Sequence, residues 1–469
     1  MSKKADGVDT DLATQEQIAG YARAEADLTQ MRVPVLLHAS NPRERLYIAA
    51  QDGTGNSLYK DAPENRSIVA RVYREIEELK DQGIKNIASG YVEGIYTQDN
   101  PLKRIPDGVN GYTFERRVET AYHQFCEQAY NWLEEDPNAQ IRVMGIGFSR
   151  GAEQTAALTR MIEQRGIQNP TDAKIVRDGE GLITHAEYTK PPLVAPGKTI
   201  QAALLLDPVS TGIEEHDRRL PPSVMSVLQV TAEHERRDLF KSTDHIPAGL
   251  SEDGRALNVT VSGAHSDVGN TYAVDGLGVL SYNLAAQYMN RVSDQPILQL
   301  RPVPENPDLF RIHHSEQHAF FYRTSGYDAD GLRDHVNGLG PDALCRTGEV
   351  RECHAKDPMS PELELQLERR IGSPSIDRTY EAAAPKSDLD RMIDQLYAAS
   401  LSGDDVTWSK ALESTSQQFM ASPEGQAWEQ EVQRYGEIQR AQDALQQQQW
   451  EQQQQLQEAP AHRPHAIRM

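Results

Sequence analysis

The stretch G-F-S-R-G at residues 147–151 decides the fold, because it lies between an apolar run and a segment that favours a helix. The run I-R-V-M-G-I (141–146) precedes it, and A-E-Q-T-A-A-L-T-R-M-I (152–162) follows it. In a strand–turn–helix context, G-x-S-x-G presents a nucleophile at the apex of a strained turn. The hydroxyl then lies at a helix N-terminus, where the dipole favours an oxyanion. The motif predicts a nucleophilic Ser149; a serine that only caps the helix is the alternative.

Strand-like and helix-like segments alternate around this motif. Strands are predicted at 45–50, 84–91, from about 140, 200–206, 224–230 and 257–262, and helices at 16–31, 67–82, 114–135, 152–162 and 277–289. The run I-Q-A-A-L-L-L (200–206) is continuously apolar, as in a strand that is buried on both faces of a parallel sheet. The alternation predicts an α/β fold of the α/β-hydrolase type, with a mainly parallel sheet flanked by helices.

The 469 residues are long enough for one large catalytic domain with additions at both ends. We expect the following parts: a polar N-terminal arm (1–40), the catalytic domain (41–330), an irregular extension (331–386), a small helical module (387–445) and a glutamine-rich tail (446–469) that is flexible. Residues 165–198 are rich in glycine, proline and charge. They are predicted to form an insertion over the C-terminal edge of the sheet.

Composition excludes several classes of function. The formal net charge is -22, without a basic stripe, so nucleic acid is not an expected partner. The acidity also argues against simple attraction to anionic lipid. Three cysteines without a C-x-x-C motif indicate a reducing compartment. The first residues are polar and lack the apolar region of a signal peptide, so any export is expected to proceed without a cleaved leader.

A serine hydroxyl needs a base to take its proton and an acid to orient that base. In α/β-hydrolases the order along the chain is serine, acid, histidine. Asp207 closes the apolar strand 200–206, and His265 lies in the loop V-S-G-A-H-S-D-V-G (261–269) that follows a later strand. These two are the predicted acid and base. His234, His245, His313 and His314 also lie downstream of Ser149 but lack this setting. Asp267 and Glu214 are the other candidates for the acid. Asp267 is expected to brace the histidine loop.

The loop D-G-T-G-N (52–56) follows the first predicted strand. Its small residues expose backbone N–H groups, so Gly53, Thr54 and Gly55, together with the amide of Arg150, are predicted to form an oxyanion hole. Asp52 is expected to hold this loop by accepting N–H bonds. Two alternatives stay open: a turn without chemistry, and an aspartyl phosphotransferase site, although the second aspartate of such sites is replaced by Thr54.

Six motifs in order resemble one family: DGTGN (52–56), YVEGIYT (91–97), GFSRGA (147–152), LLDPVSTG (205–212), EHERRDLF (233–240) and GAHSDVGNTY (263–272). Together they resemble the α/β-hydrolase domain of the type VI secretion lipase effectors, family 1, over residues 44–330. The resemblance implies Ser149, Asp207 and His265 as nucleophile, acid and base. It implies a structural role for the pair Arg236-Arg237, as an arginine fork. The sequence departs from the family pattern at Leu206 and Pro208 around the acid and at Asn270, where a glycine is usual.

The residues and the resemblance lead to one expected function. We expect a serine lipase or phospholipase that cleaves carboxyl esters of glycerophospholipids, without a cofactor and without a metal. The resemblance implies a bacterial antibacterial effector that is made in the cytoplasm and acts on the membrane or periplasm of a target cell. Its expected partners are membrane phospholipid as substrate, a secretion adaptor or spike protein, and an immunity protein. Alternatives are a catalytically silent interaction protein and an esterase of small soluble esters.

Overall fold

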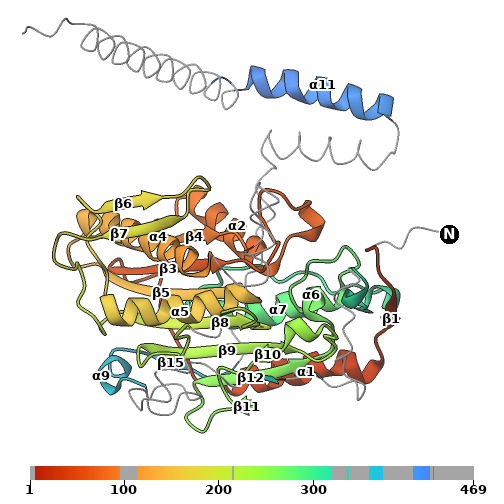
Figure 1. The fold of residues 1–469 in the computed structure, drawn as a ribbon, viewed down its shortest axis with the longest axis horizontal. Helices are drawn as coiled ribbons and strands as arrows, with labels where there is room; N and C mark the ends of the chain where they lie inside the picture. Colours follow the sequence, from red (N-terminus) through yellow and green to blue (C-terminus); the bar gives the residue numbers. More distant parts are fainter. Residues whose placement is uncertain are drawn as a thin grey trace, which may run out of the picture. The chain divides into compact units, whose positions relative to one another are not determined.

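The computed structural model divides the chain into two compact units, residues 1–376 and 377–469. The structure describes residues 6–95, 113–213, 216–318, 333, 335–336, 359–372, 405–422 and 426. In the second unit it describes helix α11 (Asp405–Ala421), which falls within the predicted helical module. The remainder of that module, the glutamine-rich tail, Cys345 and Cys353 lie outside the described residues. The first unit is built on a seven-stranded sheet (Figure 1).

The sheet is parallel except at one edge. Its strand order is β11-β12-β9-β8-β5-β3-β4, and β11 alone of these seven strands runs antiparallel to its neighbour. The strands are β3 (Glu44–Gln51), β4 (Ile87–Val92), β5 (Gln140–Phe148), β8 (Ile200–Leu206), β9 (Val224–Ala232), β11 (Gly249–Leu250) and β12 (Ala256–Val261). The chain adds β4 on one side of β3 and β5 on the other. At such a switch point, parallel sheets bind ligands outside the carboxyl ends of their strands. The predicted α/β-hydrolase class is confirmed.

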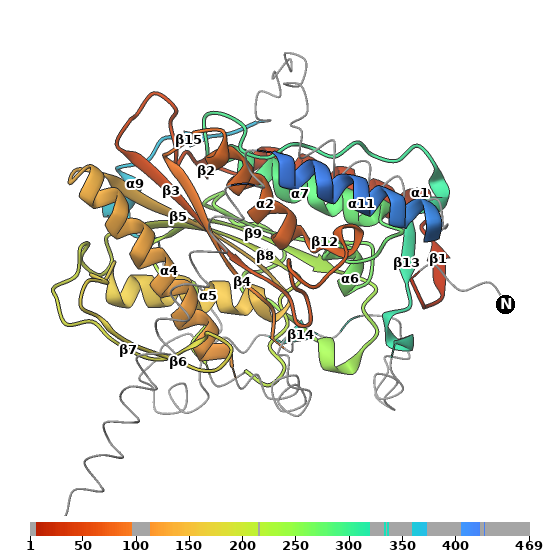
Figure 2. The ribbon, with the colours of Figure 1, turned by 90° about the horizontal axis from the view of Figure 1, so that it is seen from above.

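Helices cover both faces of the sheet, and each face has its own core (Figure 2). The helices of one face are α1 (Gln15–Gln30), α2 (Ile68–Asp81) and α7 (Gly276–Arg291), and those of the other are α4 (Phe114–Glu135) and α5 (Arg150–Arg165). Helix α2 illustrates why these segments are helical. Its apolar residues Ile68, Val72 and Ile76 recur at helical spacing and are buried. Its N-cap Ser67 accepts a hydrogen bond from the Ala70 N–H at 3.1 Å.

The N-terminal segment, expected as a polar arm, packs into the core. Helix α1 carries Tyr21, Ala24 and Leu28 at helical spacing, and all three are buried. The Tyr21 hydroxyl donates to the Ser262 carbonyl oxygen at 2.8 Å, just before the loop of the predicted base. Two short strands flank α1. Strand β1 (Thr10–Leu12) pairs with β13 (Arg311–His313), and β2 (Val33–Pro34) pairs with β15 (Arg369–Arg370).

The insertion 165–198 contains an antiparallel hairpin, β6 (Lys174–Arg177) and β7 (Ile183–Glu187). We expected it over the C-terminal edge of the sheet, but the hairpin lies along α4, where the Ile183 N–H donates to Thr120 Oγ1 at 2.9 Å. The remaining elements are short: β10 (Ser242–Thr243), α6 (His265–Val268), β14 (His335–Val336), α9 (Pro361–Glu364), and 3-10 turns at Pro63–Asn65, Asp238–Phe240, Pro307–Leu309 and Ser315–Gln317. None of the described helices is long and apolar enough to cross a membrane.

Candidate active site

Ser149 occupies a strained turn at the carboxyl end of β5. Its backbone has φ 59° and ψ -129°, with a positive φ that L-residues rarely adopt, and it occupies the N-cap position of α5 without a capping hydrogen bond from its side chain. Both flanking glycines are required by close packing. A Cβ atom at Gly147 would lie 2.2 Å from the Gly151 carbonyl oxygen, and a Cβ at Gly151 would lie 2.2 Å from the Gln51 carbonyl oxygen. The G-x-S-x-G pattern therefore has a steric cause in this structure.

Asp207 and His265 form a hydrogen-bonded pair beside this turn. His265 Nδ1 lies 2.5 Å from Asp207 Oδ2, and both side chains are buried. Asp207 ends β8 with φ 45°, and the Ala232 N–H donates to its Oδ1 at 2.8 Å. Strands β5 and β8 are paired so that Phe148 lies opposite Leu206, which brings Ser149 and Asp207 to neighbouring strand ends.

The residue before the serine contacts this pair. The Phe148 ring stacks on the His265 imidazole, with centroids 4.5 Å apart. The Ser149 N–H donates to the Leu206 carbonyl oxygen at 2.9 Å. No hydrogen bond joins the Ser149 hydroxyl to another described residue. In enzymes without bound substrate, catalytic hydrogen bonds are often long and tighten only in the reactive complex. Ser149, Asp207 and His265 thus lie together at the carboxyl ends of the strands, and the predicted acid and base are hydrogen-bonded to each other.

Electrostatics favour a charged acid and a neutral base. Burial alone would raise the pKa of Asp207, but the Arg333 guanidinium and the hydrogen bond from His265 outweigh it and hold that pKa at about 2. Burial lowers the pKa of His265, and Asp207 opposes this only in part. An ionised carboxylate beside a neutral imidazole is the arrangement that a general base requires.

The loop 52–56 lies across the switch point from Ser149. Asp52 holds it as expected: Oδ1 accepts the Gly53 N–H at 2.8 Å, and Oδ2 accepts the Tyr91 hydroxyl at 2.6 Å. Burial raises the pKa of Asp52 to about 6. The Gly55 N–H is also engaged, because it donates to the Ile95 carbonyl oxygen at 2.7 Å. Among the described residues, the N–H of Thr54 has no acceptor, so Thr54 is the loop residue best suited to an oxyanion.

Arg150 fixes this loop to the turn of Ser149, since its Nε donates to Thr54 Oγ1 at 2.8 Å. Asp267 braces the histidine loop as predicted, by accepting the Ala264 N–H at 2.8 Å. Its other oxygen lies 2.5 Å from His313 Nδ1.

The two adjacent arginines contact different partners and do not form one fork. Arg237 binds the Glu235 carboxylate through two bonds of 2.8 Å and lies 3.5 Å from the centroid of the Phe240 ring. Arg236 instead contacts His314, with Nη1 3.2 Å from Nδ1. Glu235 also accepts the backbone N–H of His265 at 3.2 Å, so the Arg237–Glu235 pair supports the loop of the predicted base.

The rival histidines have other partners. His245 contacts Glu153, His313 contacts Asp267 and Asp6, His314 contacts Asp11, and His234 contacts Gln17. Glu214, the rival acid, lies outside the described residues. No group of three or more His, Cys, Asp or Glu side chains in the described part of the chain has the arrangement of a metal site.

Two partners of the site were missed by the sequence reasoning. Glu235 lies within the motif E-H-E-R-R-D-L-F, where an acid directly before two arginines could have indicated an ion pair. Arg333, which contacts Asp207, gives no such signal, because it stands 126 residues after Asp207 in a stretch without periodicity.

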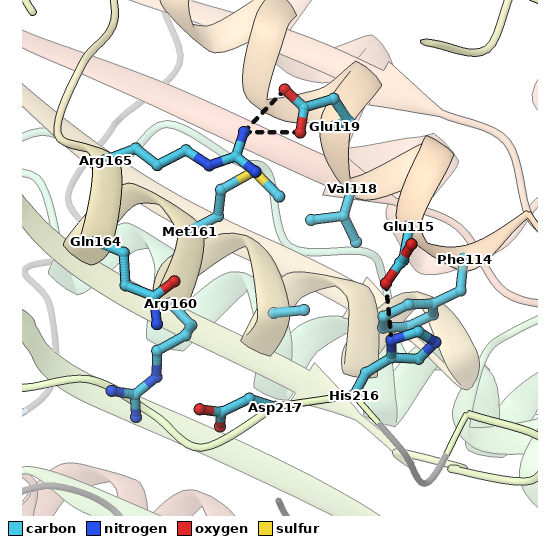
Figure 3. Close-up of a pocket in the computed structure, with 11 residues that line it drawn as sticks. Phe114, Glu115, Val118, Glu119, Arg160, Met161, Gln164, Arg165, His216 and Asp217 are labelled. Atoms are coloured by element: carbon cyan, nitrogen blue, oxygen red, sulfur yellow. Dashed lines mark hydrogen bonds and ion pairs between the residues drawn. The ribbon is translucent and has the colours of Figure 1, made fainter. Parts of the chain in front are cut away.

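A separate cavity of about 310 Å³ lies between α4, α5 and the 216–217 loop (Figure 3). Its charged side chains have partners: Arg165 binds Glu119 at 2.7 and 3.0 Å, His216 Nδ1 lies 3.4 Å from Glu115, and Asp217 accepts two hydrogen bonds from Arg219. His216 also stacks on Phe114, with centroids 4.7 Å apart. Because these groups satisfy each other, the cavity offers no counterpart to the chemistry at Ser149.

Comparison with protein families connects this geometry with known proteins. Residues 45–192 match the family described as "T6SS, Phospholipase effector Tle1-like, catalytic domain". The chain contains a Tle1-like catalytic domain. The matched residues of this Tle1-like domain include the 52–56 loop and Ser149 but end before Asp207 and His265. The resemblance inferred from the six motifs is confirmed. No curated protein matches the chain.

Three of the solved structures that are similar to this chain are an uncharacterized protein, an effector and a putative hydrolase. An uncharacterized protein from Pseudomonas aeruginosa is 15% identical, with 64% of this chain and 52% of that chain covered and a TM-score of 0.36. The Tle1 effector bound to the VgrG spike of the type 6 secretion system is 18% identical, with 51% and 52% covered and a TM-score of 0.29. A putative YdeN-like hydrolase from Pectobacterium atrosepticum is 12% identical, with 57% and 95% covered and a TM-score of 0.24. The chain thus spans about half the length of the first two.

Proposed function

We propose that the Tle1-like domain is a serine phospholipase that hydrolyses carboxyl esters of membrane glycerophospholipids. The observation that carries this proposal is the position of Ser149, in a strained turn at the sheet edge where the buried Asp207–His265 pair also lies. The family match adds the substrate class, since it names a phospholipase effector.

The proposed reaction proceeds in two halves. Ser149 Oγ attacks the ester carbonyl carbon while its proton passes to His265 Nε2, and the carbonyl oxygen becomes an oxyanion. The Arg150 and Thr54 amides donate hydrogen bonds to this oxyanion. The intermediate collapses to an acyl-serine, and the lysolipid alkoxide leaves with the proton from His265. Water then gives its proton to His265 and attacks the acyl-serine, which releases a fatty acid and restores Ser149.

Asp207 acts in both halves by holding one tautomer of His265. Its Oδ2 accepts a hydrogen bond from Nδ1–H, which keeps the proton of the neutral imidazole on Nδ1, so Nε2 carries no proton and can act as the base. The negative charge then stabilises the imidazolium that forms in each transition state. This assignment needs no metal and no cofactor.

The test is phospholipid hydrolysis by wild type and by Ser149→Ala, with products identified by mass spectrometry. The proposal predicts a fatty acid and a lysolipid from wild type, and a loss of several orders of magnitude for the variant. Ser251→Ala, in the turn between β11 and β12, is the matched control and should keep full activity. Full activity of Ser149→Ala would refute the nucleophile.

The same samples separate the two alternative functions. A fluorophosphonate that labels wild type but not Ser149→Ala supports an active serine enzyme, whereas a folded wild type that resists labelling supports a silent interaction protein. Faster turnover of short-chain soluble esters than of vesicle phospholipid supports an esterase of small esters.

Export and partners follow from the family as further proposals. The related effector was solved on a VgrG spike; for this chain we infer a spike or adaptor protein as carrier, synthesis in a bacterial cytoplasm and action on the membrane of a target cell. A producer of such an enzyme needs an immunity protein. Co-purification of the full chain with the spike protein of its own secretion system tests the first point.

A further inference from the structure

Arg333 inserts a positive charge into the centre of the site. Its Nη1 donates to Asp207 Oδ1 and, at 3.0 Å, to the Ala232 carbonyl oxygen. Its Nε and Nη2 donate to the Phe240 carbonyl oxygen at 3.0 and 2.6 Å. The side chain is 3% exposed. A buried guanidinium therefore binds the oxygen of the acid that His265 does not use.

The neighbouring backbone anchors Arg333 to the same region. Strand β14, which starts two residues later, pairs in parallel with β10, so that His335 lies opposite Ser242. Strand β10 is in turn attached to the residue after the acid, since the Thr243 N–H donates to the Pro208 carbonyl oxygen at 2.9 Å. Residue 333 thus belongs to a segment that is fixed directly to the end of β8.

The orientation of Asp207 does not depend on Arg333. The Ala232 N–H donates to Oδ1 at 2.8 Å, His265 Nδ1 binds Oδ2, and the Asp207 N–H donates to the Val230 carbonyl oxygen at 2.7 Å. These three bonds fix both the backbone and the carboxylate plane. What Arg333 adds to them is charge.

We propose that Arg333 is a positioning residue that shares the negative charge of Asp207, so that His265 stays neutral, and able to act as a base, down to a lower pH. This inference rests on the proposed function only in taking His265 as the general base. A carboxylate that is bound to a guanidinium attracts an imidazolium less strongly, because the two cations compete for one buried anion.

The other charges around His265 are compensated by their own partners. Glu235 contacts the His265 N–H but is bound by Arg237 through two bonds. Asp267, two residues after the base, is bound to His313. The nucleophile side contributes the uncharged Phe148 ring. Arg333 is therefore the described cation that acts on the acid itself. Burial is the main cause that lowers the pKa of His265, and a cation bound to Asp207 acts in the same direction.

Two variants separate charge from hydrogen bonding. Arg333→Gln removes the charge and keeps an N–H donor for the neighbouring carbonyl groups, whereas Arg333→Lys keeps the charge. The measurement is kcat/KM as a function of pH. We expect the acid limb of Arg333→Gln to move to higher pH by about one unit, with about tenfold lower activity below the limb. Its alkaline plateau should change much less, and Arg333→Lys should keep the limb of wild type.

A titration that needs no turnover completes the test. In the Ser149→Ala background, the ring resonances of His265 are followed by NMR with and without Arg333→Gln, and the glutamine variant should titrate at higher pH. An inactive wild type would refute the proposed function but leave this titration interpretable. The proposal is overturned if His265 titrates equally with and without Arg333→Gln. It is also overturned if Arg333→Gln and Arg333→Lys lose activity equally at every pH, or if the glutamine variant does not fold.

Discussion

The buried carboxylate of Glu153 provides the sharpest test of the energetics near the nucleophile. Glu153 lies in the first turn of α5, four residues after Ser149, and its side chain has no exposed surface. Its Oε2 accepts Arg218 Nη1 at 2.6 Å and lies 3.1 Å from His245 Nε2, and both partners are also fully buried. Glu153→Gln keeps the shape of the side chain and removes its charge, so the buried Arg218 guanidinium loses the carboxylate that it binds at 2.6 Å.

Two independent routes give a similar size for the effect. Burial would raise the pKa of Glu153, but Arg218 and His245 outweigh burial and lower it from 4.5 to about 2. Such a lowering corresponds to roughly 3 kcal/mol of stability at neutral pH. Removal of one member of a buried ion pair costs about 3–5 kcal/mol in proteins generally. We therefore expect Glu153→Gln to lower the free energy of unfolding by about 3 kcal/mol at pH 7.

The sign of the pH dependence follows from the lowered pKa. The contribution of Glu153 is fully present above the unfolded value near 4.5, and it is lost as the pH falls towards about 2. The stability difference between wild type and Glu153→Gln should therefore shrink over this window. Urea unfolding followed by tryptophan fluorescence measures this difference at each pH. Glu187→Gln, which breaks an exposed pair with Lys174, is the matched control and should change little at any pH.

A loss of less than about 1 kcal/mol in Glu153→Gln at pH 7, the range of exposed ion pairs, would contradict a stabilising buried pair. A difference in unfolding free energy that stays unchanged below pH 4 would also contradict it, because a cause other than charge, such as altered packing, would then explain the loss. Replacement of both Glu153 and Arg218 by methionine should be less harmful than Glu153→Gln alone, since no buried charge is then left unpaired.

Three further outcomes follow from the site. Asp207→Asn should lower kcat by roughly three to four orders of magnitude in the phospholipid assay while circular dichroism stays native, because an amide favours the wrong tautomer of the base. Gly151→Val should abolish activity and lower Tm, because its Cβ would lie 2.2 Å from the Gln51 carbonyl oxygen, whereas Gly179→Ala, in open space, should alter neither. The pKa of His313 is raised because two carboxylates outweigh its burial. Its stabilising effect is therefore complete below about pH 6.5 and lost as pH rises through the folded value, so His313→Gln should lower Tm more at pH 6 than at pH 9.

The sequence was most informative where periodicity and turn chemistry act locally. The predicted helix 114–135 coincides with α4, and β5 ends at Phe148, directly before the serine. Such segments are determined by neighbouring residues, so the turn at Ser149 and the succession of strands along the chain could be predicted. The N-terminal segment shows the limit of composition. Its polar character pointed to an arm, but three buried residues on one face of α1 are enough to dock it.

Long-range partners could not be predicted in this way. The Gly53 and Gly55 N–H groups, predicted for the oxyanion hole, donate to Asp52 Oδ1 and to the Ile95 carbonyl oxygen in this structure, and no local pattern reveals these partners. The contact of Arg333 with Asp207 likewise depends on the pairing of β14 with β10, two strands of two residues each. Strands this short carry no periodic signal.

The departures from the family pattern have physical explanations in this structure. Asn270, where a glycine is usual, has φ 57°, and asparagine is among the few residues that accept this left-handed conformation. Its side chain also accepts Arg301 Nη1 at 2.7 Å, an interaction that a glycine could not make. Asparagine in place of glycine thus keeps the left-handed backbone conformation and adds a hydrogen bond with Arg301.

The same reasoning applies to the acid, which is flanked by Leu206 and Pro208 instead of the usual neighbours. Asp207 has φ 45°, and its position is held by the Val230 carbonyl oxygen and the Ala232 N–H on the adjacent strand. These are backbone groups, so the identity of the flanking side chains matters little for its orientation. An altered motif therefore does not imply a silent enzyme, and Arg333→Gln should change the pH profile while the Asp207–His265 hydrogen bond persists.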